Sequence, residues 1–249
     1  MTSVRKIAFL SALLCGAVLA GSPAFAWRSA FDEKCENRDG RYSPDVRIDA
    51  CNKNMHIDRN DAKNLASDYV NRANGYEDRG DLEKALADVS EAVRLYPATR
   101  EGWLNRCELY SKIKRYELAL ADCNRAVEND PAGSKAHYNR GNVYRDLKNF
   151  TQAMENYNRA AALNPRDVRV YINRGITFED LNDPQRALDD YNTALKLDPK
   201  SDLALENRGY AHATLGKKAE AIADFKAALA LNPNRRNARE QLQKLETAQ

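Results

Sequence analysis

The cysteines offer the most specific chemistry in this chain of 249 residues. Five are present, and four of them form two pairs with the same internal spacing, Cys35 with Cys51 and Cys107 with Cys123. Thiols can close disulfides, act as nucleophiles or bind metals. Because the chain contains no Cys-x-x-Cys pattern, neither a zinc site nor a dithiol redox centre is indicated.

Side-chain amides also recur, at a constant interval. An Asn-Arg dipeptide appears five times with the same spacing, and we call its asparagines the asparagine column: Asn71, Asn105, Asn139, Asn173 and Asn207. Each amide offers a hydrogen-bond acceptor and donors, which is what an extended polypeptide backbone requires of a binding site. Asparagine is a mediocre helix former, so five at one interval require a reason.

Residues for catalysis or for binding a cofactor are missing. His56, His137 and His212 are far apart in the sequence, and no metalloprotease, serine hydrolase or phosphate-loop motif occurs. The segment 37–40 resembles part of a calcium loop, but the downstream Glu that completes such a loop is absent. We therefore predict no enzymatic activity, no cofactor and no metal site.

The N-terminal segment 1–26 predicts export. Basic residues Arg5 and Lys6 precede an apolar run over 7–21, and Ala-Phe-Ala follows at 24–26. This is the pattern of a secretory signal peptide cleaved before Trp27, and the run is shorter than the ~20 residues of a spanning helix. We predict an exported protein, in the periplasm, with no stable membrane anchor after cleavage, and Cys15 is removed with the signal.

The charge of the chain is nearly balanced. Lys and Arg number 39 and Asp and Glu 36, and the leader holds two of the basic residues, which leaves 37 against 36. Nucleic-acid binders normally carry a clear basic excess, so a nucleic-acid partner is not expected.

Other residue types recur along the chain with the same spacing as the asparagine column. Proline follows it at Pro97, Pro131, Pro165, Pro199 and Pro233. Each interval contains two amphipathic helical stripes separated by a short turn, so every unit is predicted to be a helix hairpin. A single hairpin cannot bury its apolar face, but stacked hairpins can. The predicted units are 66–99, 100–133, 134–167, 168–201 and 202–235.

These columns resemble the tetratricopeptide repeat, a helix hairpin of roughly 34 residues. The third unit carries the signature at His137, Gly141, Tyr144, Ala153, Tyr157, Ala160 and Pro165, and the fourth at Tyr171, Gly175, Phe178, Ala187, Tyr191, Ala194 and Pro199. The resemblance implies an all-α fold, a right-handed superhelical solenoid of helix hairpins. Residues 236–249 are expected to form the C-terminal cap helix. The signature is specific for the fold and only weakly specific for function.

The side chains at two positions of the repeat vary in size in opposite directions, so that one is small where the other is large. Where the first helix has glycine the second has an aromatic residue, as with Gly141 and Tyr157, and in the second unit the same two columns read Cys107 and Cys123. Cys35 and Cys51 repeat this spacing in the segment before the first unit. We infer a degenerate N-terminal hairpin at 27–65, slightly longer than the repeats. After export we predict both pairs as disulfides, whereas free buried thiols would suit a cytosol.

A third column pairs charges. The Arg of each Asn-Arg dipeptide flanks the predicted core, and a buried charge needs a partner. The second helices supply one at Asp88, Asp122, Asp190 and Asp224, with Asn156 as the exception. We predict structural ion pairs.

In tetratricopeptide repeats the first helices line a concave groove, and the resemblance places the asparagine column there, together with Lys135, Asn142 and Arg169. The column is similar to the asparagine ladder of O-linked N-acetylglucosamine transferases, where amides hold target polypeptides. Alternatively, each Asn bonds to a neighbouring helix and keeps the stack in register. The lysine position of the family's chaperone-binding clamp holds Val70, Leu104, Tyr138, Ile172 and Glu206, so that clamp is absent.

The expected function is a non-enzymatic scaffold that binds an extended peptide or a partner helix in the groove. Alternatives are an accessory subunit of a cell-envelope enzyme, such as a peptidoglycan hydrolase, and a self-assembling structural protein. The expected partner is a protein or a peptide.

Overall fold

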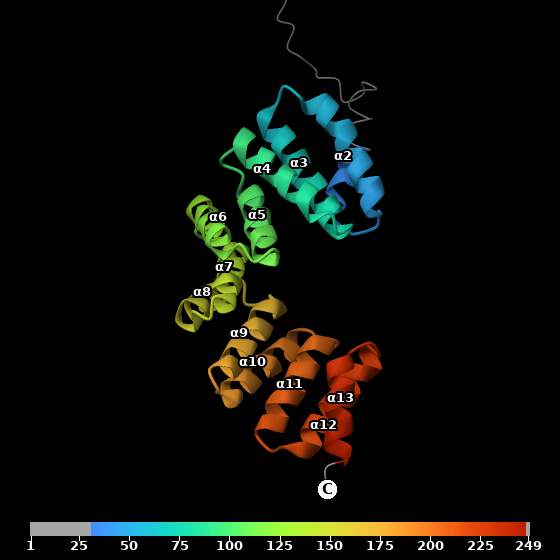
Figure 1. Cartoon of the computed structure of the whole chain (residues 1–249), viewed down its shortest axis with the longest axis vertical. Helices are drawn as coiled ribbons and strands as arrows, with labels where there is room; N and C mark the ends of the chain where they lie inside the picture. The colour runs from blue at the N-terminus through green and yellow to red at the C-terminus, as the bar shows by residue number, and fades with distance from the viewer. Residues whose placement is uncertain (1–30, 248–249) are drawn as a thin grey trace, which may run out of the picture.

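The chain is helical along the part that the computed structural model describes, residues 31–247 (Figure 1). The predicted signal peptide lies outside these residues. Residues 31–36 form a short helix. Within the described range twelve further helices follow: α2 (Pro44–Asp58), α3 (Ala62–Asp78), α4 (Leu82–Leu95), α5 (Arg100–Lys112), α6 (Tyr116–Asn129), α7 (Ser134–Asp146), α8 (Phe150–Leu163), α9 (Val168–Asp180), α10 (Pro184–Leu197), α11 (Asp202–Thr214), α12 (Lys218–Leu231) and α13 (Arg236–Thr247).

Capping and turn residues set the ends of the helices. The side chains of Thr99, Asp167 and Ser201 accept hydrogen bonds from backbone N–H groups in the first turns of α5, α9 and α11. The turn inside each hairpin contains one residue with φ between 58° and 87°: Gly80, Lys114, Lys148, Asn182 and Gly216. This left-handed residue lets the chain reverse directly into the next helix.

Successive hairpins stack on one another. The pairs α3 with α4, α5 with α6, α7 with α8, α9 with α10 and α11 with α12 pack together, and each second helix also packs against the first helix of the next hairpin. The first helices contact each other in the series α3, α5, α7, α9 and α11. They form the inner layer of a curved solenoid (Figure 1), which confirms the predicted all-α superhelical fold.

Glycine and an aromatic ring share one place in the core of three hairpins. A Cβ added to Gly175 would lie 2.5 Å from Cε1 of Tyr191, and one added to Gly141 would lie 2.8 Å from Cε1 of Tyr157. Both rings are fully buried. The glycine is therefore required by the close approach of the ring, as the paired columns of the sequence predict.

The four cysteines lie in the two expected pairs at disulfide-bonding distance. The Cα atoms of Cys35 and Cys51 are 4.8 Å apart, and those of Cys107 and Cys123 are 5.3 Å apart. All four side chains are buried. In the second repeat, the disulfide takes the place of the contact between glycine and an aromatic ring.

The arginine of the Asn-Arg dipeptide joins three helices in four of the five repeats. Arg174, for example, donates to both carboxylate oxygens of Asp190 at 2.8 and 2.6 Å, and also to Asn158 on the preceding hairpin at 2.8 Å. Arg72, Arg106 and Arg208 bind Asp88, Asp122 and Asp224 in the same way, and Arg140 binds Asn156 and Asn124. The predicted pairs are therefore present, and a second set of bonds, absent only for Arg106 among the described arginines of this series, links four of the hairpins to the one before.

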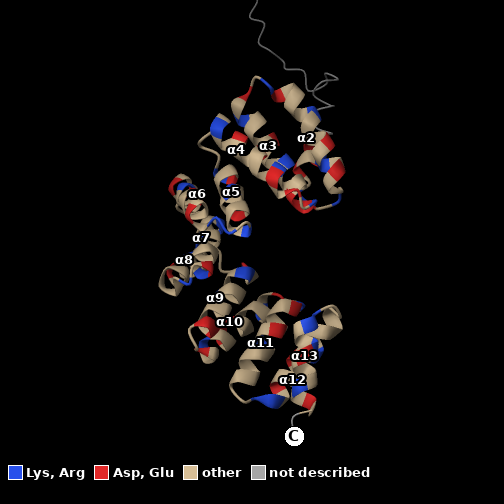
Figure 2. Ribbon diagram, viewed as in Figure 1, with Lys and Arg blue, Asp and Glu red and all other residues tan. Residues whose placement is uncertain are grey.

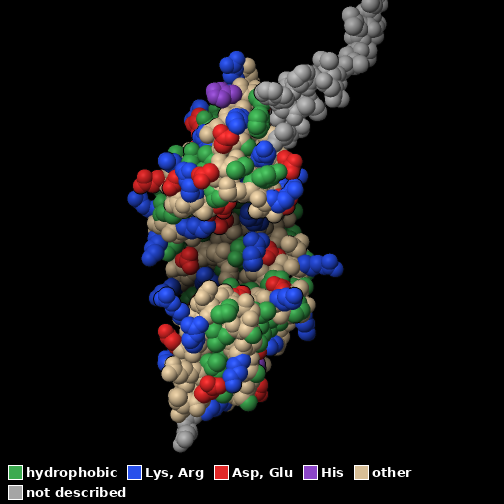
Figure 3. All heavy atoms as spheres, turned by 90° about the vertical axis from the view of Figure 1, so that its right-hand side faces the viewer, with side chains coloured by type: hydrophobic (Ala, Val, Ile, Leu, Met, Phe, Trp, Pro, Cys, Tyr) green, Lys and Arg blue, Asp and Glu red, His purple; other side chains and the backbone are tan. Residues whose placement is uncertain are grey.

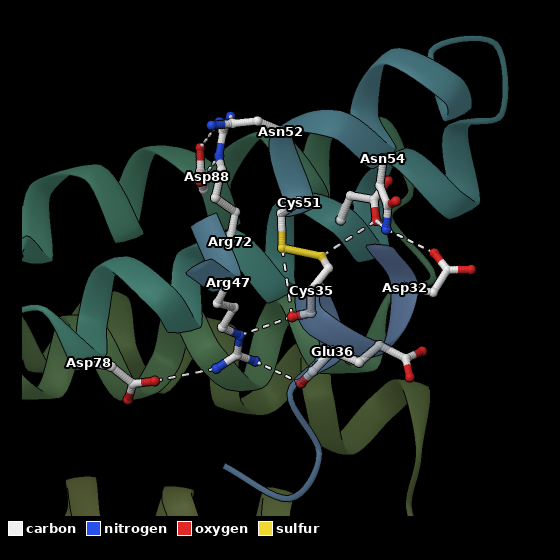
Figure 4. The surroundings of a disulfide bond; sticks show 11 residues. Asp32, Cys35, Glu36, Arg47, Cys51, Asn52, Asn54, Arg72, Asp78 and Asp88 are labelled. Atoms are coloured by element: carbon white, nitrogen blue, oxygen red, sulfur yellow. Dashed lines mark hydrogen bonds and ion pairs between the residues drawn. A yellow bond between two sulfur atoms is a disulfide. The ribbon is translucent and has the colours of Figure 1, made fainter. Parts of the chain in front are cut away.

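The N-terminal hairpin, formed by helix 31–36 and α2, follows the same plan, and the extra helical turn lies after it, in α3. Arg72 donates to Asn52, which occupies the place that Asn124 and Asn158 occupy later in the chain. The additional residues lengthen α3, which has 17 residues where α5 has 13. Arg47 donates to the backbone oxygens of Cys35 and Glu36 and so satisfies the end of the short helix at 31–36 (Figure 4).

The last helix covers the open end of the stack. Ala238 of α13 is buried in a cluster with Ala221 and Phe225, and Leu242 and Leu245 pack against that cluster. Acidic and basic residues are interspersed along the solenoid (Figure 2). None of the helices within residues 31–247 combines the length and the apolar composition needed to cross a membrane.

Candidate peptide-binding groove

The inner face of the solenoid is hollowed midway along its length (Figure 3). A cavity of about 400 Å³ lies there between α5, α7 and α9. Its lining is mostly polar: Cys107, Glu108, Ser111, Lys112, Tyr138, Asn139, Asn142, Val143, Arg145, Asp146, Arg169 and Asn173.

The structure brings together only part of the predicted site. Asn139, Asn142, Asn173 and Arg169 line this one cavity. Asn105 and Lys135 line a neighbouring depression of about 400 Å³, and Asn71 lines a third of about 500 Å³ nearer the N-terminus. Asn207 lies beyond these three, on α11. The asparagine column is therefore distributed along the inner face.

Asn173 is fully used in holding the inner helices together. Its Nδ2 donates to the hydroxyl of Tyr138 at 2.7 Å and to Oδ1 of Asn142 at 3.0 Å. Its Oδ1 accepts from Nη1 of Arg145 at 3.4 Å. This side chain keeps α7 and α9 in register, which is one of the two interpretations of the column.

A second layer supports this network from behind. Tyr157, on α8, passes over Gly141 and donates its hydroxyl to Oδ1 of Asn142 at 2.8 Å. Burial raises the pKa of Tyr157, so its hydroxyl remains a donor at ordinary pH. The oxygen of Asn142 thus accepts two hydrogen bonds and is fixed, while its amide nitrogen is left for the cavity.

Whether an asparagine of the column is used internally depends on the residue opposite it on the preceding first helix. Asn105 and Asn173 have Asn74 and Asn142 there, and each donates to it. At the corresponding places, Asn139 has Glu108, whose carboxylate binds Lys112 instead, and Asn207 has Ile176, which offers no acceptor on its side chain. The amide nitrogens of Asn139 and Asn207 are buried and have no hydrogen-bond partner. From Asn105 to Asn207 the column therefore alternates between residues that hold the register of the stack and residues with an unused donor.

Asn139 combines an unused donor with access to the cavity. Its side chain is only 6% exposed, and it lines the hollow between α5, α7 and α9. A buried amide N–H without a partner is costly, by about 1–3 kcal/mol, unless a ligand or water satisfies it. This donor makes Asn139 a candidate position for binding an acceptor oxygen.

Charged groups of both signs border the cavity. Arg169 forms a paired contact with Asp167, the N-cap of α9, which raises the pKa of Arg169 and lowers that of Asp167. The guanidinium of Arg169 also lies 5.1 Å from the centre of the Tyr138 ring. Arg145 makes only long contacts, to Asn173 and to Asp146 at 3.7 Å. Most of its donor capacity remains available.

Several residues of the cavity are not among the predicted site residues. Tyr138 forms the centre of the network, and Lys112, Arg145 and Glu108 complete the rim. Tyr138 does carry a signal in the sequence, since the same repeat position holds an apolar residue in three other units (Val70, Leu104 and Ile172). The others depend on how neighbouring hairpins are placed and carry no comparable signal.

Among residues 31–247, no three His, Cys, Asp or Glu side chains are placed to hold a metal ion. His137 is buried, and its Nε2 lies 3.2 Å from the backbone oxygen of Pro131. It is a packed core residue.

Sequence comparison finds the tetratricopeptide repeat along most of the solenoid. One profile with this description matches residues 70–134 and 172–236, and a second matches 134–167. The first alone spans more than half of the chain. No curated protein matches the chain significantly.

Solved structures with the same architecture are distant in sequence. The TPR protein YrrB is 21% identical, with a TM-score of 0.56, over 79% of this chain and 99% of its own. The protein TTC0263 of Thermus thermophilus is 18% identical, with a TM-score of 0.63, over 73% and 98%. The Cut9–Hcn1 hetero-tetramer of APC/C is 17% identical, with a TM-score of 0.69, over 88% of this chain and 48% of its own. These likenesses agree in fold, and with the profile matches they show that the chain belongs to the tetratricopeptide repeat family.

Proposed function

We propose that this protein is a non-enzymatic scaffold that binds an extended polypeptide segment on its inner face, centred on the cavity between α5, α7 and α9. The observation that carries the proposal is the buried, unused N–H donor of Asn139 in that cavity. A backbone carbonyl oxygen of a bound segment would satisfy this donor.

The surrounding side chains fit a polypeptide better than a small apolar ligand. Asn142 supplies a second amide nitrogen on the same helix, its oxygen fixed by Tyr157 and Asn173. Tyr138 offers a ring for side-chain contact, and Arg145 offers donors for a carbonyl or carboxylate. A binding site described as peptide-binding is known in the structurally similar protein YrrB.

We propose that the protein works in an exported, oxidising compartment such as the periplasm. Four buried cysteines in two pairs at disulfide distance support this, because disulfides persist there and are rare in a reducing cytosol. A scaffold in the cell envelope would bring a partner protein to an assembly or to an enzyme.

The proposal is tested by selecting binders to the oxidised protein from a library of unstructured peptides. Asn139→Ala should weaken the selected peptides by about tenfold, the value of roughly one hydrogen bond. The matched control is Asn207→Ala, which removes an equally unused donor of the same column outside the cavity and should leave affinity unchanged. An equal effect of both variants, or none from Asn139→Ala, would contradict the proposal.

A further inference from the structure

A further, smaller cavity lies at the N-terminal end of the inner face. It has a volume of about 110 Å³ and lies between helix 31–36, α2 and α3. Its described lining is polar and contains four acidic and no basic side chains: Asp32, Glu36, Asn54, Asp58, Asn64, Ser67, Asp68 and Asn71.

The cavity is polar because Asp, Asn and Asp occupy positions that hold mainly apolar core residues in the other repeats. Asp68 lies in a column that holds Gly102, Ala136, Val170 and Ala204 in the other units. Asn54 lies three residues after Cys51, as Ala126 lies three after Cys123, and that column is alanine in every full repeat. By the same alignment Asp32 corresponds to Leu104. The interface between the N-terminal hairpin and α3 is therefore polar where all later interfaces are apolar.

Two buried oxygen atoms in this cavity have no partner. Asn54 is 1% exposed, and its Nδ2 donates to Oδ1 of Asp32 at 2.8 Å and to Oδ1 of Asp68 at 3.4 Å. This uses the amide hydrogens and leaves Oδ1 of Asn54 unpaired (Figure 4). Oδ2 of Asp68, a residue only 5% exposed, accepts no N–H from the described residues. Oδ1 of Asn54 therefore requires a hydrogen-bond donor, and Oδ2 of Asp68 requires one when neither Asp68 nor the neighbouring Asp58 is protonated.

We propose that this cavity binds the cationic end of a Lys or Arg side chain supplied by the polypeptide in the groove. That the side chain comes from a polypeptide in the groove rests on the proposed function, whereas the binding of a cation in this cavity does not depend on it. A nitrogen cation supplies both a positive charge and several N–H donors for the unpaired oxygens. A metal ion is disfavoured, because among the described residues no three acidic groups converge closely enough to coordinate one.

The position of the cavity connects it to the groove. Ser67 and Asn71 line this cavity and also the adjoining depression of about 500 Å³. That depression in turn shares Arg100, Glu101 and Asp130 with the next one along the inner face. A segment lying along these first helices therefore passes directly over the acidic cavity.

The electrostatics favour cation binding at neutral and higher pH. Burial, followed by repulsion from Asp58, raises the pKa of Asp68 to about 7. The acidic groups facing Asp68 are Asp32 and Glu36 from helix 31–36 and Asp58 from α2. Because the ionised carboxylate binds a cation best, affinity should rise by about tenfold between pH 6 and pH 8, as a group of this pKa ionises.

The experiment uses the full oxidised chain and two free probes, methylammonium and methylguanidinium chloride. Binding is followed by chemical shifts of the α2 and α3 amides, against sodium chloride of equal ionic strength and against calcium chloride. We expect saturable binding with Kd on the order of millimolar, since the probes have few atoms. Absence of saturation by both organic cations, or stronger binding of calcium, would overturn the proposal.

Variants separate this site from general charge effects. Asp68→Asn should weaken probe binding at least about tenfold, consistent with loss of a charged hydrogen bond. Asp68→Ala, which restores the residue found at Ala136 and Ala204, should do the same in a folded chain. The control is Asp49→Asn on the exposed side of α2, which should bind as wild type. Wild-type affinity in both Asp68 variants would refute the assignment.

Peptides selected on the groove then test the source of the cation. They should carry a Lys or Arg at a fixed distance from the segment that needs Asn139, and replacing that residue by norleucine should weaken binding only when Asp68 is present. Probe binding without any basic preference in the peptides would refute the groove polypeptide as the source. Failure of the Asn139 test alone would refute the groove and leave probe binding intact.

Discussion

The N-terminal hairpin and the second repeat each contain a disulfide at the same place, but their surroundings differ. Around Cys107 and Cys123 the neighbours are apolar, with Ala119 and Val143 in one buried cluster. Beside Cys35 and Cys51 the interface with α3 contains Asn54 and Asp68 instead. The same covalent link therefore lies in apolar surroundings in one hairpin and beside a partly polar interface in the other.

This difference separates two uses of a disulfide. In the second repeat it fills the space that glycine and an aromatic ring fill in the following repeats, so packing could replace it. In the N-terminal hairpin Asn54 and Asp68 replace apolar residues at the interface with α3, and the link adds stability by restricting the unfolded chain. The proposed acidic cavity requires this polar interface, and the disulfide offsets the stability that the polar interface costs.

The largest effect is expected from removing the N-terminal disulfide. Cys35→Ala/Cys51→Ala should cost the hairpin about 3 kcal/mol, the chain-entropy value for a loop of this size. Because Asn54 and Asp68 are polar where the repeats have apolar residues, α2 should open locally while the central repeats stay folded. Hydrogen exchange should show α2 amides losing protection and α7 to α10 keeping theirs. Retained protection of α2 would mean that its packing is sufficient.

Removing the second disulfide should have an effect that depends on the replacement. Cys107→Ala/Cys123→Ala should also lower the free energy of unfolding by about 3 kcal/mol, because it leaves a cavity in the folded state and removes the cross-link that restricts the unfolded chain. Cys107→Gly/Cys123→Tyr installs the pair found at Gly141 and Tyr157 and should recover most of that loss. Urea unfolding of both double variants measures the difference. Equal destabilisation would show that the glycine and ring contact cannot replace the link.

The stability of the two regions should also differ in its response to pH. The pKa of Asp68 is raised from 3.8 to about 7 in the folded protein, so the folded state holds the proton more tightly. The stability that this contributes is complete below about pH 4 and is lost as the pH rises to about 7. Protection of α2 should therefore fall across this window relative to α7, and Asp68→Asn should abolish the trend. A trend that persists in this variant would assign it to another group.

The smallest effect concerns the turns of the repeats. Lys148 has a φ of 59°, at a place where Gly80 and Gly216 stand in other repeats. Lys148→Gly should stabilise the chain by about 0.5–1 kcal/mol, because glycine adopts this conformation without steric cost. The reverse change, Gly216→Lys, should destabilise it by a similar amount. A thermal unfolding series in which both variants match wild type would show that these turns are not strained.

The sequence by itself determined the repeat, the hairpins, the phase of the cysteines and the pairing of the arginine column. These features depend on contacts between residues at fixed, short separations, such as the 16 positions from Arg174 to Asp190, and they recur along the repeats. A periodic pattern therefore records them directly.

Only the tertiary structure decided which members of the asparagine column are available. Asn173 donates to Asn142 on the preceding hairpin, whereas Asn139 stands opposite Glu108, whose carboxylate binds Lys112 instead. The acidic cavity likewise needs three helices to bring Asp32, Asn54 and Asp68 together. Such contacts cross between hairpins and depend on the angle and distance of stacking, which no single column of residues specifies.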